Sequence, residues 1–91
     1  MSKVYIIYED DHGLIGVANT FQNVIKYLID TSWIDDSYEV TLIDENELWN
    51  SENIVTHFGK DWRNIIINMT EQEFFDAFCA FSIEQLEVYG T

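Results

Sequence analysis

Few residues of this chain have the type and spacing for catalysis or metal binding. Two histidines, His12 and His57, and one cysteine, Cys79, are spread along the sequence without a paired motif, whereas a zinc site needs four ligands at short spacings. Cys79 lies between Phe78 and Phe81, a pattern that predicts a buried thiol with a raised pKa rather than a nucleophile. The sequence therefore predicts a non-enzymatic protein without a metal site or cofactor.

One predicted turn carries several polar groups side by side. Glu9, Asp10, Asp11 and His12 follow one another directly, and carboxylate oxygens are the ligands that a hard cation such as Mg²⁺ or Ca²⁺ prefers. The four residues do not match the alternating ligand positions of a calcium-binding EF-hand loop. A small metal- or ligand-binding protein that uses residues 9–12 is kept as an alternative.

Carboxylates dominate the composition. The 91 residues contain 17 Asp and Glu against four Lys and Arg, a formal net charge of −13 at pH 7. Binding of nucleic acid or of an anionic membrane needs a basic surface, so the sequence argues against both. A folded chain of this mass exposes on the order of 5,500 Å². An even spread would place only about two or three acids on the roughly 800 Å² that one partner buries, so clustering of acids would indicate a binding surface.

The acids do cluster along the chain. Between Tyr27 and Gly59 there are eight acids and no Lys or Arg. Such a surface could occupy a basic groove that normally holds a phosphate backbone, steered by charge and anchored by exposed tryptophans. The candidate partner-binding residues are Asp30, Asp35, Asp36, Glu39, Asp44, Glu45, Glu47, Glu52, Trp33 and Trp49.

The first half of the chain has clear signals for the elements that position these residues. Residues 3–8 and 14–18 are rich in β-branched and apolar side chains around the turn at 9–13, which predicts a β-hairpin. Apolar residues at helical spacing follow a cap at Asn19 or Thr20, which predicts a helix over 21–29. Residues 38–43 alternate as a strand does.

The second half is less regular. Residues 44–58 favour a helix that ends before Gly59, and the isoleucines within 63–69 favour a buried strand. Thr70 to Glu73 is a capping box, so a helix should begin there. Residues 83–89 favour a closing strand, with a short helix capped by Ser82 as the alternative.

Together the elements follow the order β-β-α-β-α-β-α-β. This order predicts a single α+β domain over residues 1–91, with a largely antiparallel sheet and helices packed on one face. The longest apolar runs are far shorter than the roughly 20 residues that span a bilayer. Met1-Ser2-Lys3 leads straight into a β-branched run instead of a secretory signal. We therefore expect a cytoplasmic protein.

The beginning of the chain resembles a known group of proteins. The segment Val4-Tyr5-Ile6-Ile7-Tyr8-Glu9-Asp10-Asp11-His12-Gly13, the following Leu14-Ile15-Gly16-Val17-Ala18 and a helix ending Tyr27-Leu28-Ile29-Asp30 are similar to small phage-encoded accessory proteins of low-GC bacteria. This group includes acidic anti-CRISPR inhibitors that resemble DNA and block the site where an effector nuclease reads its target-adjacent motif. The resemblance implies an inhibitor in the host cell cytoplasm whose partner is a CRISPR effector nuclease with an arginine-lined groove.

A protein-interaction or assembly module of phage origin is the main alternative. Such a module could form a homodimer along an exposed sheet edge. Steep salt dependence of partner binding would favour the inhibitor, whereas self-association that is insensitive to salt would favour the module.

Overall fold

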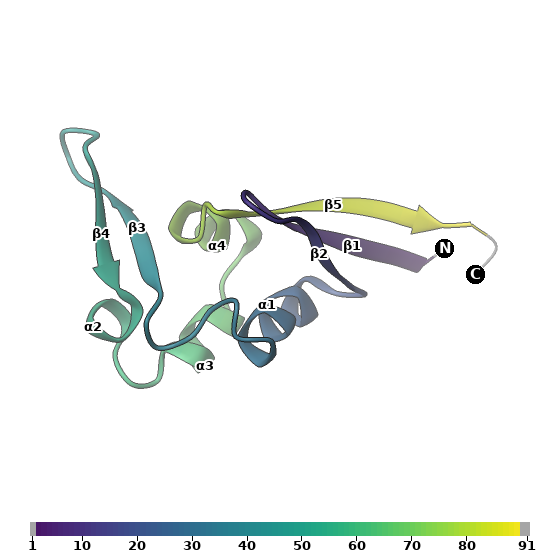
Figure 1. Ribbon diagram of the computed structural model, residues 1–91, viewed down its shortest axis with the longest axis horizontal. Coiled ribbons are helices and arrows are strands. Elements are labelled where there is room, and N and C mark those ends of the chain that lie inside the picture. The colour runs from purple at the N-terminus through teal and green to yellow at the C-terminus, as the bar shows by residue number, and fades with distance from the viewer. Residues whose placement is uncertain (1, 90–91) are drawn as a thin grey trace.

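Two antiparallel sheets and four helices make up the computed structural model over the residues that it describes, 2–89. In chain order the elements are β1 (Ser2–Glu9), β2 (Gly13–Ala18), α1 (Phe21–Asp30), β3 (Glu39–Ile43), β4 (Trp49–Asn53), α2 (Ile54–Phe58), α3 (Trp62–Ile67), α4 (Glu71–Ala77) and β5 (Phe81–Val88) (Figure 1). The larger sheet has the order β2-β1-β5, and β3 pairs with β4 in the smaller one. The predicted α+β class with antiparallel pairing is confirmed.

The N-terminal hairpin and the closing strand form as predicted. β1 pairs with β2 from Tyr5↔Ala18 to Glu9↔Gly13, and the register shifts between Ile7 and Tyr8. β1 also pairs with β5 along its whole length, from Ser2↔Val88 to Glu9↔Phe81. The β-branched and aromatic side chains of β1 suit this central position, where both edges of the strand are paired. The alternative of a short helix after Ser82 is wrong.

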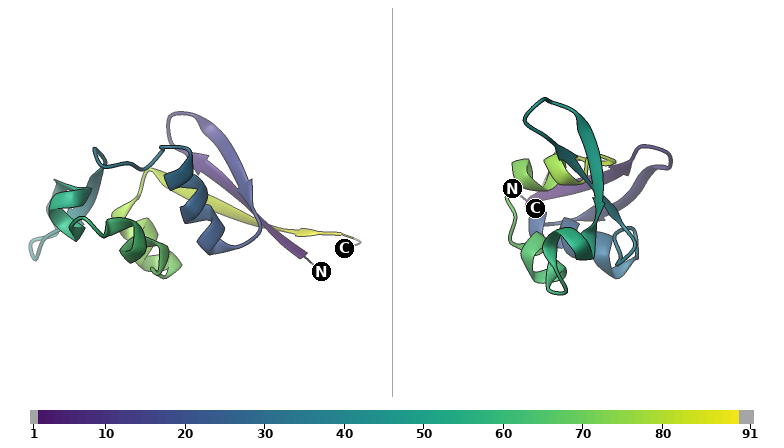
Figure 2. Two further views of the ribbon diagram at one scale, coloured as in Figure 1. Left: turned by 90° about the horizontal axis from the view of Figure 1, so that it is seen from below. Right: turned by 90° about the vertical axis from the view of Figure 1, so that its left-hand side faces the viewer.

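Helix α1 covers one face of the three-stranded sheet (Figure 2). The Thr20 hydroxyl caps its first turn by accepting the Asn23 N–H at 3.1 Å. Val24, Ile25 and Leu28 are fully buried, because their spacing places them on the face turned toward the sheet. The predicted helix is therefore confirmed at both its cap and its apolar face.

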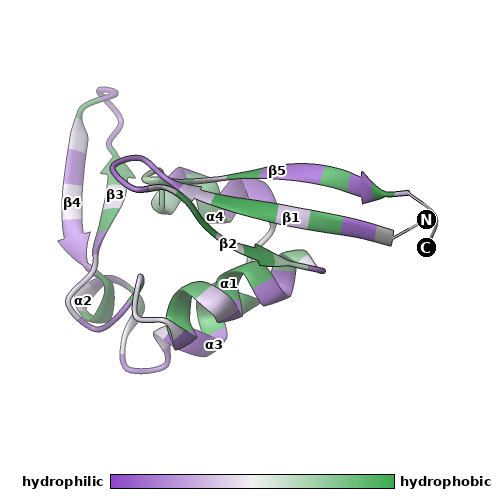
Figure 3. Ribbon diagram, turned by 45° about the vertical axis from the view of Figure 1, so that its right-hand side comes forward, coloured by the Kyte–Doolittle hydropathy of each residue, from purple (hydrophilic) through white to green (hydrophobic). Residues whose placement is uncertain are grey.

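Residues 44–58 differ from the predicted helix. The chain turns at 44–48, returns as β4 and becomes helical only in α2, where the Asn53 side chain accepts the N–H groups of Val55 and Thr56. β4 reads Trp-Asn-Ser-Glu-Asn and is largely hydrophilic (Figure 3), so no apolar alternation marks it as a strand. Its conformation depends on pairing with β3, from Glu39↔Asn53 to Ile43↔Trp49. The end of the helix at Gly59 is confirmed.

The predicted strand over 63–69 is wrong. Residues Trp62–Ile67 form helix α3, in which Trp62 and Ile66 are at most 1% exposed and Ile65 is 41% exposed. The spacing of four residues places Trp62 and Ile66 on one helical face. α4 begins at the predicted capping box, where Thr70 and Glu73 bond to each other's backbone N–H. The observed order is therefore β-β-α-β-β-α-α-α-β.

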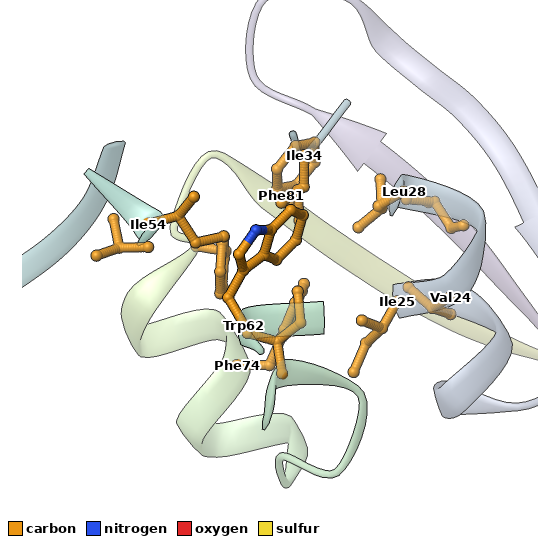
Figure 4. Packing of buried hydrophobic residues seen from close by; sticks show 12 residues of the cluster. Val24, Ile25, Leu28, Ile34, Ile54, Trp62, Phe74 and Phe81 are labelled. Carbon is orange, nitrogen blue, oxygen red and sulfur yellow. The ribbon is translucent and has the colours of Figure 1, made fainter. Parts of the chain in front are cut away.

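One hydrophobic core joins these elements. Trp62 lies between Ile54 of α2 and the apolar face of α1 (Figure 4). The Phe74 ring stacks on Phe78 with ring centres 4.7 Å apart and meets Phe21 edge to face at 5.9 Å. Such aromatic pairs contribute beyond the area that they bury. Within residues 2–89, no helix has the length and apolar character needed to cross a membrane.

Close packing at Gly16 leads to a first prediction. A Cβ atom added at this position would lie 2.5 Å from the Tyr27 ring, whose hydroxyl donates to the Ile15 carbonyl. We expect Gly16→Ala to lower the free energy of unfolding by about 1–3 kcal/mol, the usual cost of overpacking. Urea denaturation would measure this loss. Replacing Tyr27 with Leu in the same chain should make the added methyl group nearly neutral, and equal costs in both backgrounds would contradict the steric explanation.

Candidate partner-binding surface

The β3–β4 hairpin projects away from the rest of the molecule (Figures 1 and 2). Asp44 N–H donates to the Leu48 carbonyl at 3.1 Å, and Glu47 N–H donates to the Asp44 carbonyl at 3.0 Å. The Asp44 carboxylate also accepts the N–H groups of Asn46 and Leu48, at 2.8 and 2.9 Å. Residues 43–49, called the hairpin tip below, are therefore held in a defined loop.

The loop brings acids and apolar side chains together in solvent. Glu45 and Glu47 are exposed, and no hydrogen bond or ion pair involves their carboxylates in the part of the chain that the structure describes. Ile43, Leu48 and Trp49 are 56%, 61% and 68% exposed. Exposed apolar residues scattered singly need no explanation, but these three are grouped at the hairpin tip, and grouped exposed apolar residues indicate a candidate interaction site.

The sequence predicts Trp49 as a candidate anchor and does not single out Ile43 or Leu48, which the structure places beside it at the tip. A signal was present, since large apolar residues flank a turn of acids and asparagine on both sides.

Four of the eight predicted acids form hydrogen bonds or ion pairs within the molecule. Asp35 accepts the N–H and hydroxyl of Ser37, and these bonds lower the pKa of Asp35. Asp36 accepts the Trp62 indole N–H at 2.8 Å and lies 3.4 Å from the Arg63 guanidinium. The other two are Asp44, in the loop described above, and Glu52, which lies 3.1 Å from the His57 ring nitrogen Nδ1. Charge reversal at these positions would disturb the fold as well as the surface.

Two predicted residues lie away from the hairpin tip. Asp30 ends α1 and lines a shallow surface groove of about 410 Å³ together with Lys26 and Tyr27. Trp33 is half-buried, because its ring meets the His12 ring edge to face at 5.0 Å and Phe81 at 6.5 Å. The structure therefore assembles Asp44, Glu45, Glu47 and Trp49 at the tip, with Glu39 and Glu52 along the two strands.

The bases lie outside the β3–β4 hairpin and helix α4. Lys26 lies on α1, Lys60 in the segment before α3 and Arg63 on α3, on the lower side of the molecule in Figure 1. Helix α4 packs against β3 and adds Glu71, Glu73 and Asp76 to the hairpin. Residues 39–53 and 71–77, called the acidic surface below, carry five plus three, or eight, acids and no base. Within the hairpin Glu39 and Glu52 lie on opposite faces, because Glu52 pairs with Val40.

The turn at residues 9–12 is braced internally. Glu9 is 9% exposed, and its carboxylate lies 2.8 Å from His12 Nδ1 and accepts the Asp11 N–H at 2.6 Å. Both bonds lower the pKa of Glu9, and the bond to His12 has the larger effect. Across residues 2–89, no three or more His, Cys, Asp or Glu side chains are grouped so that they could hold a metal ion.

The predicted core position of Cys79 is wrong. Cys79 is an exposed free thiol in the turn between α4 and β5, and its sulfur lies 3.3 Å from the Thr41 hydroxyl. The flanking Phe78 and Phe81 are 0% and 4% exposed. The turn reverses the chain between these two residues, so both rings enter the core while the thiol faces solvent.

Tyr38, beside this turn, leads to a second prediction. Burial, with the negative charges of Cys79, Glu9 and Asp10, raises the pKa of Tyr38 to about 12. Below pH 10 the phenol is neutral in both states. Between about pH 10 and 12 only the unfolded chain loses its proton, so the free energy of unfolding should fall in this window. Because water reaches part of the ring, we expect a loss of about 1 kcal/mol.

Chemical denaturation between pH 8 and 12 would measure this effect. Tyr38→Phe should flatten the alkaline part of the stability curve. Tyr89→Phe is the matched control, because the Tyr89 side chain is 95% exposed. An unchanged slope in the Tyr38 variant would show that Tyr38 does not cause the alkaline loss.

Comparisons of the chain with protein-family models, with curated proteins and with solved structures find no match.

Proposed function

We propose that this protein is a non-enzymatic inhibitor that binds the basic groove of a nucleic-acid-handling protein, such as a CRISPR effector nuclease, in place of the nucleic acid. The hairpin tip carries the proposal. It projects from the molecule and combines the unpaired carboxylates of Glu45 and Glu47 with the exposed ring of Trp49. Carboxylates can replace phosphates opposite arginine or lysine, and a large aromatic ring is the preferred anchor of a protein interface.

The backbone of the tip supports the same role. Glu47 has φ of +61°, a left-handed conformation that favours Gly or Asn and costs other residues on the order of 1–3 kcal/mol. The Glu47 N–H closes a turn onto the Asp44 carbonyl, and hairpin loops normally place Gly at a left-handed position of this kind.

The distribution of charge supports long-range attraction. The acidic surface carries eight of the 17 acids and no base, while three of the four bases belong to α1, α3 and the segment before α3. A one-signed surface on a small protein speeds its encounter with an oppositely charged groove, and the effect weakens as salt is added.

Affinity capture tests the proposal. The immobilised protein should retain a nucleic-acid-binding protein from host lysate at about 50 mM salt, release it at about 500 mM, and also release it when duplex DNA is added. The purified partner should then bind DNA less tightly in the presence of this protein. Retention that neither salt nor DNA reverses would contradict the proposal.

A second candidate function is a homodimeric assembly module, favoured by the open face of the three-stranded sheet. Leu14, Val17 and Leu86 are 59%, 56% and 43% exposed, and they pair with Tyr8, Ile6 and Val4 of β1 on the face opposite the buried Ile7. The carboxylate on this face belongs to Glu84 and accepts the Tyr8 hydroxyl at 3.0 Å. Two highly acidic copies would meet here with little repulsion. Sedimentation would then show a dimer that persists in high salt and is lost in Val17→Glu.

A further inference from the structure

A groove lies between β3 and α4, next to the hairpin tip. It has a volume of about 360 Å³ and is lined by Thr41, Leu42, Ile43, Glu73, Asp76 and Ala77. Residues 41–43 of strand β3 form one wall of the groove, and two acids and Ala77 of the helix form the other. The groove continues the acidic surface, because Ile43 belongs to both the groove lining and the hairpin tip.

The two carboxylates of the groove retain capacity for a ligand. Glu73 Oε1 accepts the Thr70 N–H at 3.0 Å in the capping box, and the bonds to Thr70 lower the pKa of Glu73. Asp76 Oδ1 accepts the Gln72 side-chain amide at 3.0 Å. Each carboxylate has a second oxygen outside these bonds, and the spacing of three residues places both groups on one helical face. The groove therefore pairs an apolar surface with two neighbouring acceptors.

We propose that this groove binds an arginine side chain presented by the basic partner. The methylene stem lies against Leu42 and Ala77, and the guanidinium meets Glu73 and Asp76. Arginine fits better than lysine, because its planar group is weakly hydrated, tolerates apolar contact and donates to two carboxylate oxygens at once. The inference rests on the proposed function, since that function supplies a partner rich in such side chains.

A bare metal ion fits the groove less well. A hard cation takes six or more oxygen ligands or keeps its own waters, whereas the groove offers two carboxylates beside apolar side chains. Within the described part of the chain, these acids do not belong to any cluster suited to a metal. An organic cation with an apolar stem uses both parts of the lining.

NMR titration of the ¹⁵N-labelled full chain tests this inference with two tripeptides, acetyl-Gly-Arg-Gly-amide and its lysine analogue. We expect saturable shifts of the amides of residues 41–43 and 73–77, with binding of the arginine peptide at least threefold tighter. The double variant Glu73→Gln with Asp76→Asn should weaken binding at least tenfold. Its fold should persist, because Gln also completes a capping box and Asn also accepts the Gln72 amide.

Glu71→Gln is the matched control. It removes the same charge from the same helix outside the groove lining, and it should change the affinity less than twofold. The inference is overturned if the double variant binds the arginine peptide as the wild type does. It is also overturned if the shifts spread over all acids without preference for the groove, or if Asp76→Asn alone, as a milder variant, leaves the affinity unchanged.

The test separates this inference from the proposed function. If a basic partner is captured and DNA displaces it, but the groove does not bind arginine, only the proposal for the groove is contradicted. Arginine binding in the groove, with no partner that salt and DNA release, would contradict the proposed function alone.

Discussion

Reversing the two unpaired charges of the hairpin tip, with Glu45→Lys and Glu47→Lys, should weaken binding to the captured basic partner by about ten- to a hundredfold at low salt. The change removes two attractions and adds two repulsions on a surface that steers association. Neither carboxylate supports the loop, which the Asp44 side chain holds through Asn46 and Leu48. The fold should therefore persist. Kd measured by calorimetry at two salt concentrations, with circular dichroism as the check of folding, gives the result.

The matched control changes the net charge equally on other surfaces. Asp30→Lys with Glu87→Lys alters α1 and β5, which lie outside the acidic surface. This pair should change Kd by less than threefold. If the control weakens binding as much as the tip variant does, net charge rather than the hairpin determines affinity. If neither does, the hairpin tip is not the interface.

Truncation at the centre of α3 should have the largest effect on stability. Ile66 is 0% exposed and lies one helical turn from the buried Trp62. We expect Ile66→Ala to lower the free energy of unfolding by about 2–5 kcal/mol, since the cavity adds to the lost transfer energy. For a domain with a total of about 5–15 kcal/mol, this loss removes a large part of the stability. Urea denaturation followed by tryptophan fluorescence would measure it.

The neighbouring isoleucine provides the control. Ile65 is 41% exposed, so Ile65→Ala should cost less than about 1 kcal/mol, because much of its side chain is already in water. Equal costs at both positions would mean that the isoleucines are buried alike. That result would contradict the helical face described for α3.

Where local chemistry specifies the conformation, the sequence predicted the structure well. The capping box at Thr70, the cap at Thr20 and the turn before Gly13 satisfy the backbone within a few residues. Helix α1 also has a complete apolar face. These signals are local, so they can be recognised without knowledge of the rest of the chain.

The candidate site was predicted in part. Eight clustered acids and Trp49 could be recognised from composition alone. Their separation into structural and free carboxylates could not, because Asp36 is bound by Trp62 and Arg63, which lie 26 and 27 residues away. The exposure of Cys79 was likewise hidden, since a turn between two buried rings looks the same in sequence as an apolar helical face.

The sequence by itself determined the α+β class, the first hairpin, helix α1, the start of α4 and an unusually negative charge. Only the tertiary structure decided that residues 62–67 are helical, that the hydrophilic β4 is a strand, and which acids remain free at the hairpin tip. The physical reason is common to all three. A short apolar run fits the spacing of a helix as well as that of a strand. A polar strand is stabilised by its partner strand, and a carboxylate is free or bound according to its neighbours in space. In each case the deciding residues are distant in the chain.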